Sequence, residues 1–130
     1  MTSGPTSPET GEAGHRALLA DSVTAFTGRG ADVARARRWR GSPEEYDRAA
    51  WLQMGELGWL GVLVPEQYGG SGLGLSEAAI VAEGLARSLT PEPYTAIAVL
   101  AAGVLRAAEN ESLKNNLLPK LAAGELIPAV

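Results

Sequence analysis

The alternation of apolar and polar residues is clearest from Ser42 to Leu75, and this stretch organises the rest of the chain. Ser42 is a favoured N-cap residue, Pro43 fits the first helical position, and Glu45 completes a capping box three residues after the serine. These signals predict a helix that begins at Ser42 and ends at Gly58. Apolar residues recur along one face of it at steps of three and four: Tyr46, Ala49, Ala50, Trp51, Met54 and Leu57.

A short apolar run and a glycine-rich loop follow this helix. Pro65 stops the run from Trp59 to Val64, and the loop then offers four positions that tolerate positive φ: Gly69, Gly70, Gly72 and Gly74. The loop superficially resembles a phosphate-binding loop, but its spacing matches neither G-x-x-x-x-G-K-[ST] nor G-x-G-x-x-G, and no predicted strand precedes it. The pattern therefore favours a structural loop, in which glycines let the chain turn tightly beside helices.

The same periodicity predicts four further helices, over residues 11–28, 76–89, 94–108 and 110–124. Ser76 and Asn110 are the expected caps of two of them. Pro119 removes a backbone donor, so we expect the last helix to kink or end near Leu118. The chain is therefore predicted to be all-α, an antiparallel or up-and-down bundle of about five helices with short loops.

The helix expected over Tyr94–Ala108 carries Thr95 as its only strongly polar side chain up to Leu105. A helix that is apolar all round is buried on all sides, so we place it in the centre of the bundle. Its many small residues permit close packing, and they equally leave room for a slender apolar ligand.

A basic cluster between Arg29 and Arg40 surrounds Trp39. Guanidinium groups can bind phosphate in a bidentate manner, and an indole can stack on a base. Because the cluster is short and the chain is acidic overall, we favour a solvated linker between helices, with a contact to the nucleotide end of coenzyme A as the alternative. His15 has no partner nearby in sequence and is interpreted as a surface residue rather than a general base.

Composition narrows the classes of function further. A chain of 130 residues suits one domain, and a net charge of −4 gives no reason to expect a nucleic-acid or membrane partner. The absence of cysteine and the single histidine exclude disulfides and thiolate or histidine metal clusters. No run approaches the ~18 apolar residues of a membrane span, and the N-terminus lacks the features of a secretory signal. The cytoplasm is therefore the expected compartment.

Two stretches resemble a known family. Residues 55–89 read GELGWLGVLVPEQYGGSGLGLSEAAIVAEGLARSL, and residues 118–127 read LPKLAAGELI. These two stretches resemble the sequence of the N-terminal helical domain of the acyl-CoA dehydrogenases. The PEQYGGSG loop over Pro65–Gly72 is the most specific part of the resemblance. The resemblance implies a helical domain over residues 11–125 and the start of a β-rich middle domain over 126–130. The rest of that β domain and a C-terminal domain are then missing from this chain. Residues 1–10 are rich in Ser, Thr and Pro with almost nothing to bury, so their composition predicts a disordered tail.

The resemblance also implies a chemistry. Acyl-CoA dehydrogenases remove the pro-R α-hydrogen of an acyl-CoA thioester as a proton and transfer the β-hydrogen as a hydride to FAD. In the family the carboxylate base and most FAD contacts belong to the missing domains, so no catalytic or cofactor-binding residue is nominated, and this chain alone is expected to be inactive. The helix over residues 94–108 helps to wall the fatty-acyl cavity in the family. The carried-over candidates for substrate binding are Tyr94, Ile97, Ala98 and Ala101.

The expected partners follow from this resemblance. They are an acyl-CoA substrate and either the missing flavin-binding domains or a complete partner subunit, in a homo- or hetero-oligomer that serves fatty acid or lipid metabolism. Acyl-CoA oxidases and flavin-dependent monooxygenases share the fold, and this segment does not separate them. The alternative from a different class is a non-catalytic helical interaction module, or a truncated subunit that pairs with a complete flavoprotein.

Overall fold

The computed structural model describes residues 8–28 and 30–129, and these residues are folded into helices and loops. Its α-helices are α1 (Pro8–Thr27), α2 (Val33–Arg40), α3 (Arg48–Glu56), α4 (Leu75–Arg87), α5 (Ala102–Ala107) and α6 (Glu111–Ala122). Two further elements are the 3₁₀ turn η1 (Glu66–Tyr68) and the π-helix η2 (Thr95–Ala101). No strand occurs within the described ranges, which confirms the all-α prediction, and α2 is the helix that was not expected.

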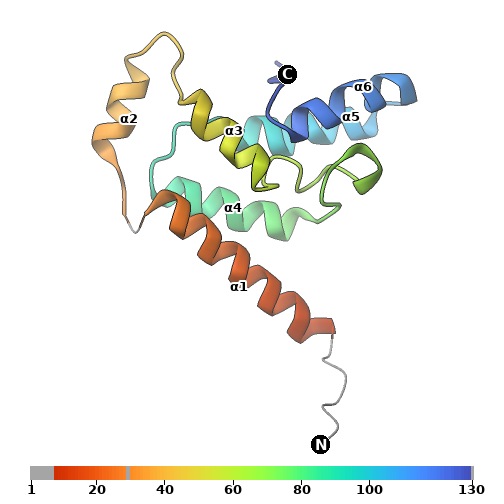
Figure 1. Ribbon diagram of the computed structural model, residues 1–130, viewed down its shortest axis with the longest axis horizontal. Helices are drawn as coiled ribbons and strands as arrows, with labels where there is room; N and C mark the ends of the chain where they lie inside the picture. Colours follow the sequence, from red (N-terminus) through yellow and green to blue (C-terminus); the bar gives the residue numbers. More distant parts are fainter. Residues whose placement is uncertain (1–7, 29, 130) are drawn as a thin grey trace, which may run out of the picture.

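Helices α1 and α4 lie side by side and run in the same direction, so this pair departs from the expected antiparallel order (Figure 1). Arg16 of α1 pairs with Glu77 of α4 over 3.2 Å. Two turns later Val23 faces Gly84, where an added methyl group would collide with the valine side chain. Glycine at position 84 therefore permits the close approach of the two helices.

The ends of α1 follow the sequence in part. The helix ends at Thr27, before Gly28 with φ of +79°, as predicted. It begins at Pro8 rather than Gly11, and its first turns project beyond α4 (Figure 1). The remainder of the expected tail, residues 1–7, lies outside the described residues.

Helix α3 begins at Arg48, so the predicted start at Ser42 is wrong. The predicted bond does form, because the Ser42 hydroxyl accepts from the Glu45 amide over 3.1 Å. Glu45, however, has φ of +62°, a left-handed conformation from which a right-handed helix cannot continue. The first turn of α3 is capped instead by Asp47, whose carboxylate accepts from the Ala49 amide over 3.0 Å.

The end of α3 is as predicted. Gly58 takes φ of +82°, and the Trp59 amide donates to the Met54 carbonyl over 3.0 Å, which together form a Schellman-type ending. The same device recurs at the end of the chain, where Gly124 has φ of +80° after α6. Asn110 caps α6 as predicted, but the helix continues through Pro119 to Ala122 rather than ending near Leu118.

Two other helix starts differ from the sequence prediction. The expected linker is helix α2, because the Asp32 carboxylate caps it by accepting from the Arg35 amide over 2.9 Å. Helix α4 begins at Leu75 with Gly74 in the cap position, so Ser76 is not the cap. The Glu77 carboxylate reaches back instead and accepts from the Gly74 amide over 3.0 Å.

The core lies where α3, the following turn, α4, η2 and α6 meet, and α1 adds Val23 to it. Its largest fully buried side chains include Trp51, Met54, Trp59, Leu118 and Leu121. Phe26 of α1 packs edge-to-face on Trp59, with ring centroids 5.2 Å apart. Helix α2 contributes no buried residue and lies at the edge of the molecule, as Figure 1 shows. Polar contacts, together with the half-buried side chains of Ala36 and Trp39, therefore attach it to the body.

Candidate functional site

The segment formed by η2 and α5 has one buried face and one exposed face, so the prediction that it is buried on all sides is wrong. Leu100 and Val104 keep 55% and 54% of their surfaces accessible. An open apolar recess lies on this side, and we call it the outer apolar face: Thr95, Val99, Leu100, Gly103, Val104 and Ala107. A contiguous exposed apolar surface of this kind is typical of a site that a ligand or another segment covers.

The predicted substrate-binding residues lie together on the opposite, buried side of this segment: Tyr94, Ile97, Ala98 and Ala101. None is more than 4% exposed, and all belong to the hydrophobic core of the chain. The Tyr94 hydroxyl donates to the Trp59 carbonyl over 3.2 Å, and burial raises the pKa of Tyr94. These side chains contact the core in the described chain, and their role in substrate binding stays a prediction.

Glu92 fixes the start of η2. Its side chain is 0% exposed, and its carboxylate accepts two hydrogen bonds from the Arg35 guanidinium. The Asp47 amide also donates to this carboxylate, over 3.2 Å, and the Tyr94 amide donates to the Glu92 carbonyl over 2.8 Å. A buried charge is tolerated when it is paired and hydrogen-bonded. Glu92 therefore joins α2, the start of α3 and the start of η2 at one point.

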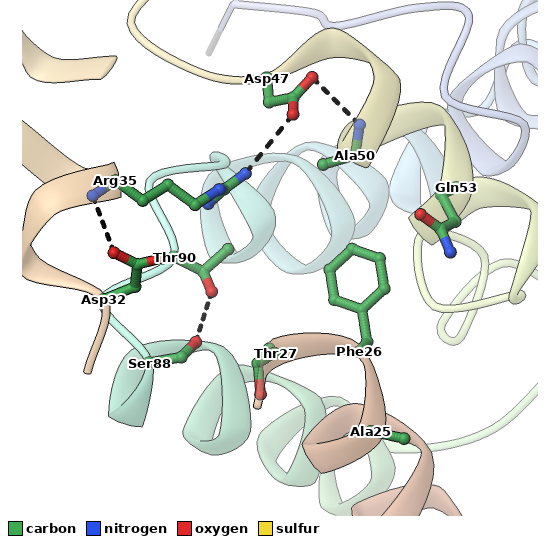
Figure 2. Close-up of a pocket in the computed structure, with 10 residues that line it drawn as sticks. All are labelled: Ala25, Phe26, Thr27, Asp32, Arg35, Asp47, Ala50, Gln53, Ser88 and Thr90. Atoms are coloured by element: carbon green, nitrogen blue, oxygen red, sulfur yellow. Dashed lines mark hydrogen bonds and ion pairs between the residues drawn. The ribbon is translucent and has the colours of Figure 1, made fainter. Parts of the chain in front are cut away.

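A cavity of about 400 Å³ lies beside this ion pair, between the ends of α1 and α4 and the starts of α2 and α3 (Figure 2). Its lining is mainly polar: Ala25, Phe26, Thr27, Asp32, Arg35, Asp47, Ala50, Gln53, Ser88 and Thr90. The hydrogen bond to Glu92 raises the pKa of Arg35, and the Asp47 carboxylate lies 3.9 Å from the same guanidinium. The Arg35 guanidinium is thus already paired with carboxylates of this chain, although it borders the cavity.

The glycine loop has no amide left for a phosphate group. The amides of Ser71, Gly72 and Leu73 donate to the carbonyls of Gly61, Val64 and Val62, and the remaining ones from Gly69 to Gly74 also donate within the chain. A methyl group at Gly70 would overlap the Val64 backbone, so the loop folds directly onto residues 61–64. This confirms the structural interpretation of the loop and disfavours a phosphate cradle.

Tyr68 ties the end of η1 to α6. Its hydroxyl donates to the Glu111 carboxylate over 2.6 Å, and Lys114 pairs with the same carboxylate over 2.9 Å. The hydrogen bond from Tyr68 is the main cause that lowers the pKa of Glu111, followed by the bond from Lys114. Glu111 therefore favours the charged form while it holds the loop to α6.

We expect the stability of the chain to fall in acid for this reason. Folding lowers the pKa of Glu111 through Tyr68 and that of Glu77 mainly through backbone amides, from an ordinary value of 4.5. The stabilisation is present above the unfolded value and is lost as pH falls through the folded values. Urea midpoints should decline from pH 5 downwards, and the decline should be shallower in Glu77→Gln and Glu111→Gln. A decline in both variants as steep as that of the unmodified chain would show that Glu77 and Glu111 do not cause the loss of stability in acid.

The basic cluster divides between two faces of α2. Arg35 points inward to Glu92, while Arg37, Arg38 and Arg40 are exposed and form no ion pair with a described residue. Their contact with a nucleotide phosphate, which was the alternative to a linker, stays a hypothesis. His15 is exposed, in agreement with a surface role. Within residues 8–28 and 30–129, no group of three His, Cys, Asp or Glu side chains could hold a metal.

No helix in the described part of the chain is long and apolar enough to cross a membrane.

The chain matches a family and several named proteins. The family model described as "Acyl-CoA dehydrogenase, N-terminal domain" matches residues 14–125. Isovaleryl-CoA dehydrogenase, mitochondrial, from Pongo abelii is 42% identical over 85 residues, which cover 64% of this chain and 20% of that protein. Acyl-CoA dehydrogenase IpdE2 from Mycobacterium tuberculosis is 31% identical over 116 residues, which cover 88% of this chain and 36% of that protein.

A solved structure is also similar. It is that of the "Tcur3481-Tcur3483 steroid ACAD G363A variant", which aligns with a TM-score of 0.73 and 27% sequence identity. The alignment covers 86% of this chain and 30% of that chain. The aligned parts of this chain thus span from a fifth to about a third of the length of these proteins.

Proposed function

Because this chain belongs to the acyl-CoA dehydrogenase family as an N-terminal domain, we propose that it serves an FAD-dependent oxidoreductase that desaturates acyl-CoA thioesters between the α and β carbons. The match over residues 14–125 carries this proposal, since it extends through every helix from α2 to α6. Relatives named as acyl-CoA dehydrogenases support the same class of reaction. The proposed compartment is the cytoplasm, and the proposed assembly is a homo- or hetero-oligomer.

The proposed contribution of the chain is an apolar wall for the acyl group. The η2–α5 segment supplies small and apolar side chains on both faces, and such surfaces bind hydrocarbon by removing it from water. The outer apolar face is accessible in the described chain, whereas Tyr94, Ile97, Ala98 and Ala101 form the layer behind it. We therefore propose that these four residues set the depth of the wall, and that Leu100 and Val104 present its surface.

The flavin chemistry is proposed to come from outside this chain. The amides of the glycine loop are already bonded, and the half-buried Arg35 in the cavity wall is paired with Glu92. The described residues therefore do not fit a complete FAD site, and none of them is assigned a catalytic role. The two relatives are about 2.5 and 3.3 times as long as this chain, since 116 aligned residues are 36% of one and 85 are 20% of the other, so they have room for the domains that hold FAD and a base.

A direct test uses the chain of residues 1–130 by itself. We expect purified protein to bind no stoichiometric FAD in a fluorescence titration and to show no acyl-CoA oxidation with an artificial electron acceptor. We also expect self-association in solution, because Leu18, Leu75 and Leu100 are each more than half exposed. A monomer with stoichiometric FAD and measurable turnover would contradict the proposal, whereas the complete flavoprotein should turn over acyl-CoA.

The wall predicts opposite effects for two phenylalanine substitutions in the complete flavoprotein. Ala101 is 0% exposed, so Ala101→Phe should overpack the core and cost about 1–3 kcal/mol of stability. Val104→Phe adds bulk on the exposed face, and it should leave stability within about 0.5 kcal/mol while it disfavours long acyl chains. Urea unfolding and kcat/KM for a short and a long acyl-CoA measure both effects. An unchanged preference among acyl-chain lengths in both variants would refute the proposal that this segment forms a wall for the acyl group.

The second candidate function is a non-catalytic helical subunit that pairs with a complete flavoprotein. The name of the similar solved protein joins two components, Tcur3481 and Tcur3483, which favours a partner of this kind for the present chain as well. Co-expression with a flavoprotein encoded beside it, followed by mass measurement, distinguishes the two candidates. A stable complex whose activity is unaffected by Val104→Phe supports the non-catalytic subunit.

A further inference from the structure

The start of η2 is held by backbone bonds and by Glu92 rather than by a helix cap. No side chain caps its first turn. The Tyr94 amide bonds to the Glu92 carbonyl over 2.8 Å, and the Ile97 amide to the Pro93 carbonyl over 3.2 Å. Pro91 and Pro93 restrict φ on both sides of Glu92. A displacement of Glu92 is therefore passed on to η2, since its neighbours have little freedom to absorb it.

The π-helical geometry makes this starting point important for the outer apolar face. A π-helix bonds residue i to i+5 and winds more residues into each turn than an α-helix, and such turns are frequent at functional sites. The position of Tyr94 at the start of the helix determines the direction in which each later side chain points, including Leu100 and Val104. We therefore expect a change at the start of η2 to shift the exposed Leu100 and Val104 together.

Arg35 controls the position of Glu92 from a different helix. Its guanidinium spans both carboxylate oxygens of Glu92, which is completely buried and lies 57 residues away in sequence. A planar fork on a carboxylate fixes both its direction and its distance. Helix α2 has no fully buried residue, so this contact and the bond from the Asp32 amide to the Ser88 carbonyl, 3.1 Å long, contribute to its attachment to the body, beside the half-buried Ala36 and Trp39.

We propose that Arg35 is a positioning residue that sets the outer apolar face through Glu92 and thereby determines acyl-chain preference in the complete enzyme. The acyl-chain part rests on the proposed function, while the positioning part concerns this chain alone. Arg35 lies in the wall of the cavity in Figure 2 and outside the outer apolar face, so it acts through Glu92 and not by touching the substrate.

Hydrogen exchange of the full 130-residue chain tests the positioning part. In Arg35→Gln we expect amides of residues 94–101 to exchange about tenfold faster relative to amides of α6. Arg35→Lys retains the charge and should restore part of the protection. Arg87→Gln, which removes an exposed pair with Glu83, is the matched control and should leave the ratio unchanged. Equal acceleration in η2 and α6 would show only general destabilisation and would overturn the proposal.

Kinetics of the complete flavoprotein test the acyl-chain part. The ratio of kcat/KM for a short and a long acyl-CoA should change about fivefold or more in Arg35→Gln and should stay constant in Arg87→Gln. An unchanged ratio alongside faster exchange in η2 would overturn the role in preference. A wild-type flavoprotein that turns over no acyl-CoA would refute the proposed function and the acyl-chain part together, and the exchange result would still decide whether Arg35 positions η2.

Discussion

Alanine in place of Gly70 is expected to lower the free energy of unfolding by about 3 kcal/mol. The added methyl group would overlap the carbonyl and Cβ of Val64. These atoms cannot turn aside, because Val64 is fully buried and its carbonyl accepts from the Gly72 amide over 2.9 Å. Overpacking of a rigid site costs typically 1–3 kcal/mol, and a collision with backbone belongs at the upper end.

Gly69→Ala is the matched control for this prediction. Gly69 has φ of +86°, but no atom lies within 4 Å of the position of an added methyl group. Only the left-handed conformation is then penalised, at about 1–2 kcal/mol. Urea unfolding followed by tryptophan fluorescence measures both variants, and equal losses would show that close approach at Gly70 is not the cause. Neither variant should lose specific phosphate binding, because the loop amides are already bonded.

Features with a local cause could be predicted from the sequence. The helix ends at Gly28, Gly58 and Gly124 follow from left-handed backbone conformations that glycine adopts without steric cost. The cap at Asn110 is likewise local, since the side chain bonds an amide three residues ahead. These signals, with the apolar periodicity and the PEQYGGSG loop, were sufficient for an all-helical fold of the correct family.

Competing local signals explain the wrong helix starts. Ser42 and Asp47 are both favoured caps within six residues, and sequence alone does not show that Glu45 takes positive φ between them. At α4 the choice lay between Ser76 and a glycine that has no side chain to cap with. There the Glu77 carboxylate supplies the bond, so the acidic residue in the first turn was the better signal.

The candidate site depended on contacts that no local pattern contains. Arg35 and Glu92 lie 57 residues apart, and the basic cluster gave no sign that one arginine would turn inward. The available signal was Glu92 itself, a carboxylate between two prolines directly before an apolar helix. The exposed face of η2 and α5 was missed for another reason. Apolar periodicity identifies surface that needs cover, but it does not say whether the same chain provides the cover.

The Arg35–Glu92 pair leads to an asymmetric prediction: Arg35→Ala should cost about 3 kcal/mol of stability, and Glu92→Gln about 1 kcal/mol. Removal of the arginine leaves a carboxylate that is 0% exposed with the Asp47 amide as its remaining donor. In Glu92→Gln the amide oxygen still accepts from Asp47, and the Arg35 side chain, 23% exposed, can turn toward water and the Asp47 carboxylate.

Urea unfolding of the two variants and of the double variant Arg35→Ala/Glu92→Gln measures this asymmetry. The double variant should recover about 1–2 kcal/mol relative to Arg35→Ala, because a neutral amide is far cheaper to bury than an unpaired carboxylate. Arg87→Ala is the control, since its pair with Glu83 is exposed and should contribute less than about 0.5 kcal/mol. Equal losses in Arg35→Ala and Glu92→Gln, with no recovery in the double variant, would show that desolvation of Glu92 does not govern this site. Arg35 would then act through packing of its hydrocarbon stem, which Arg35→Met would preserve.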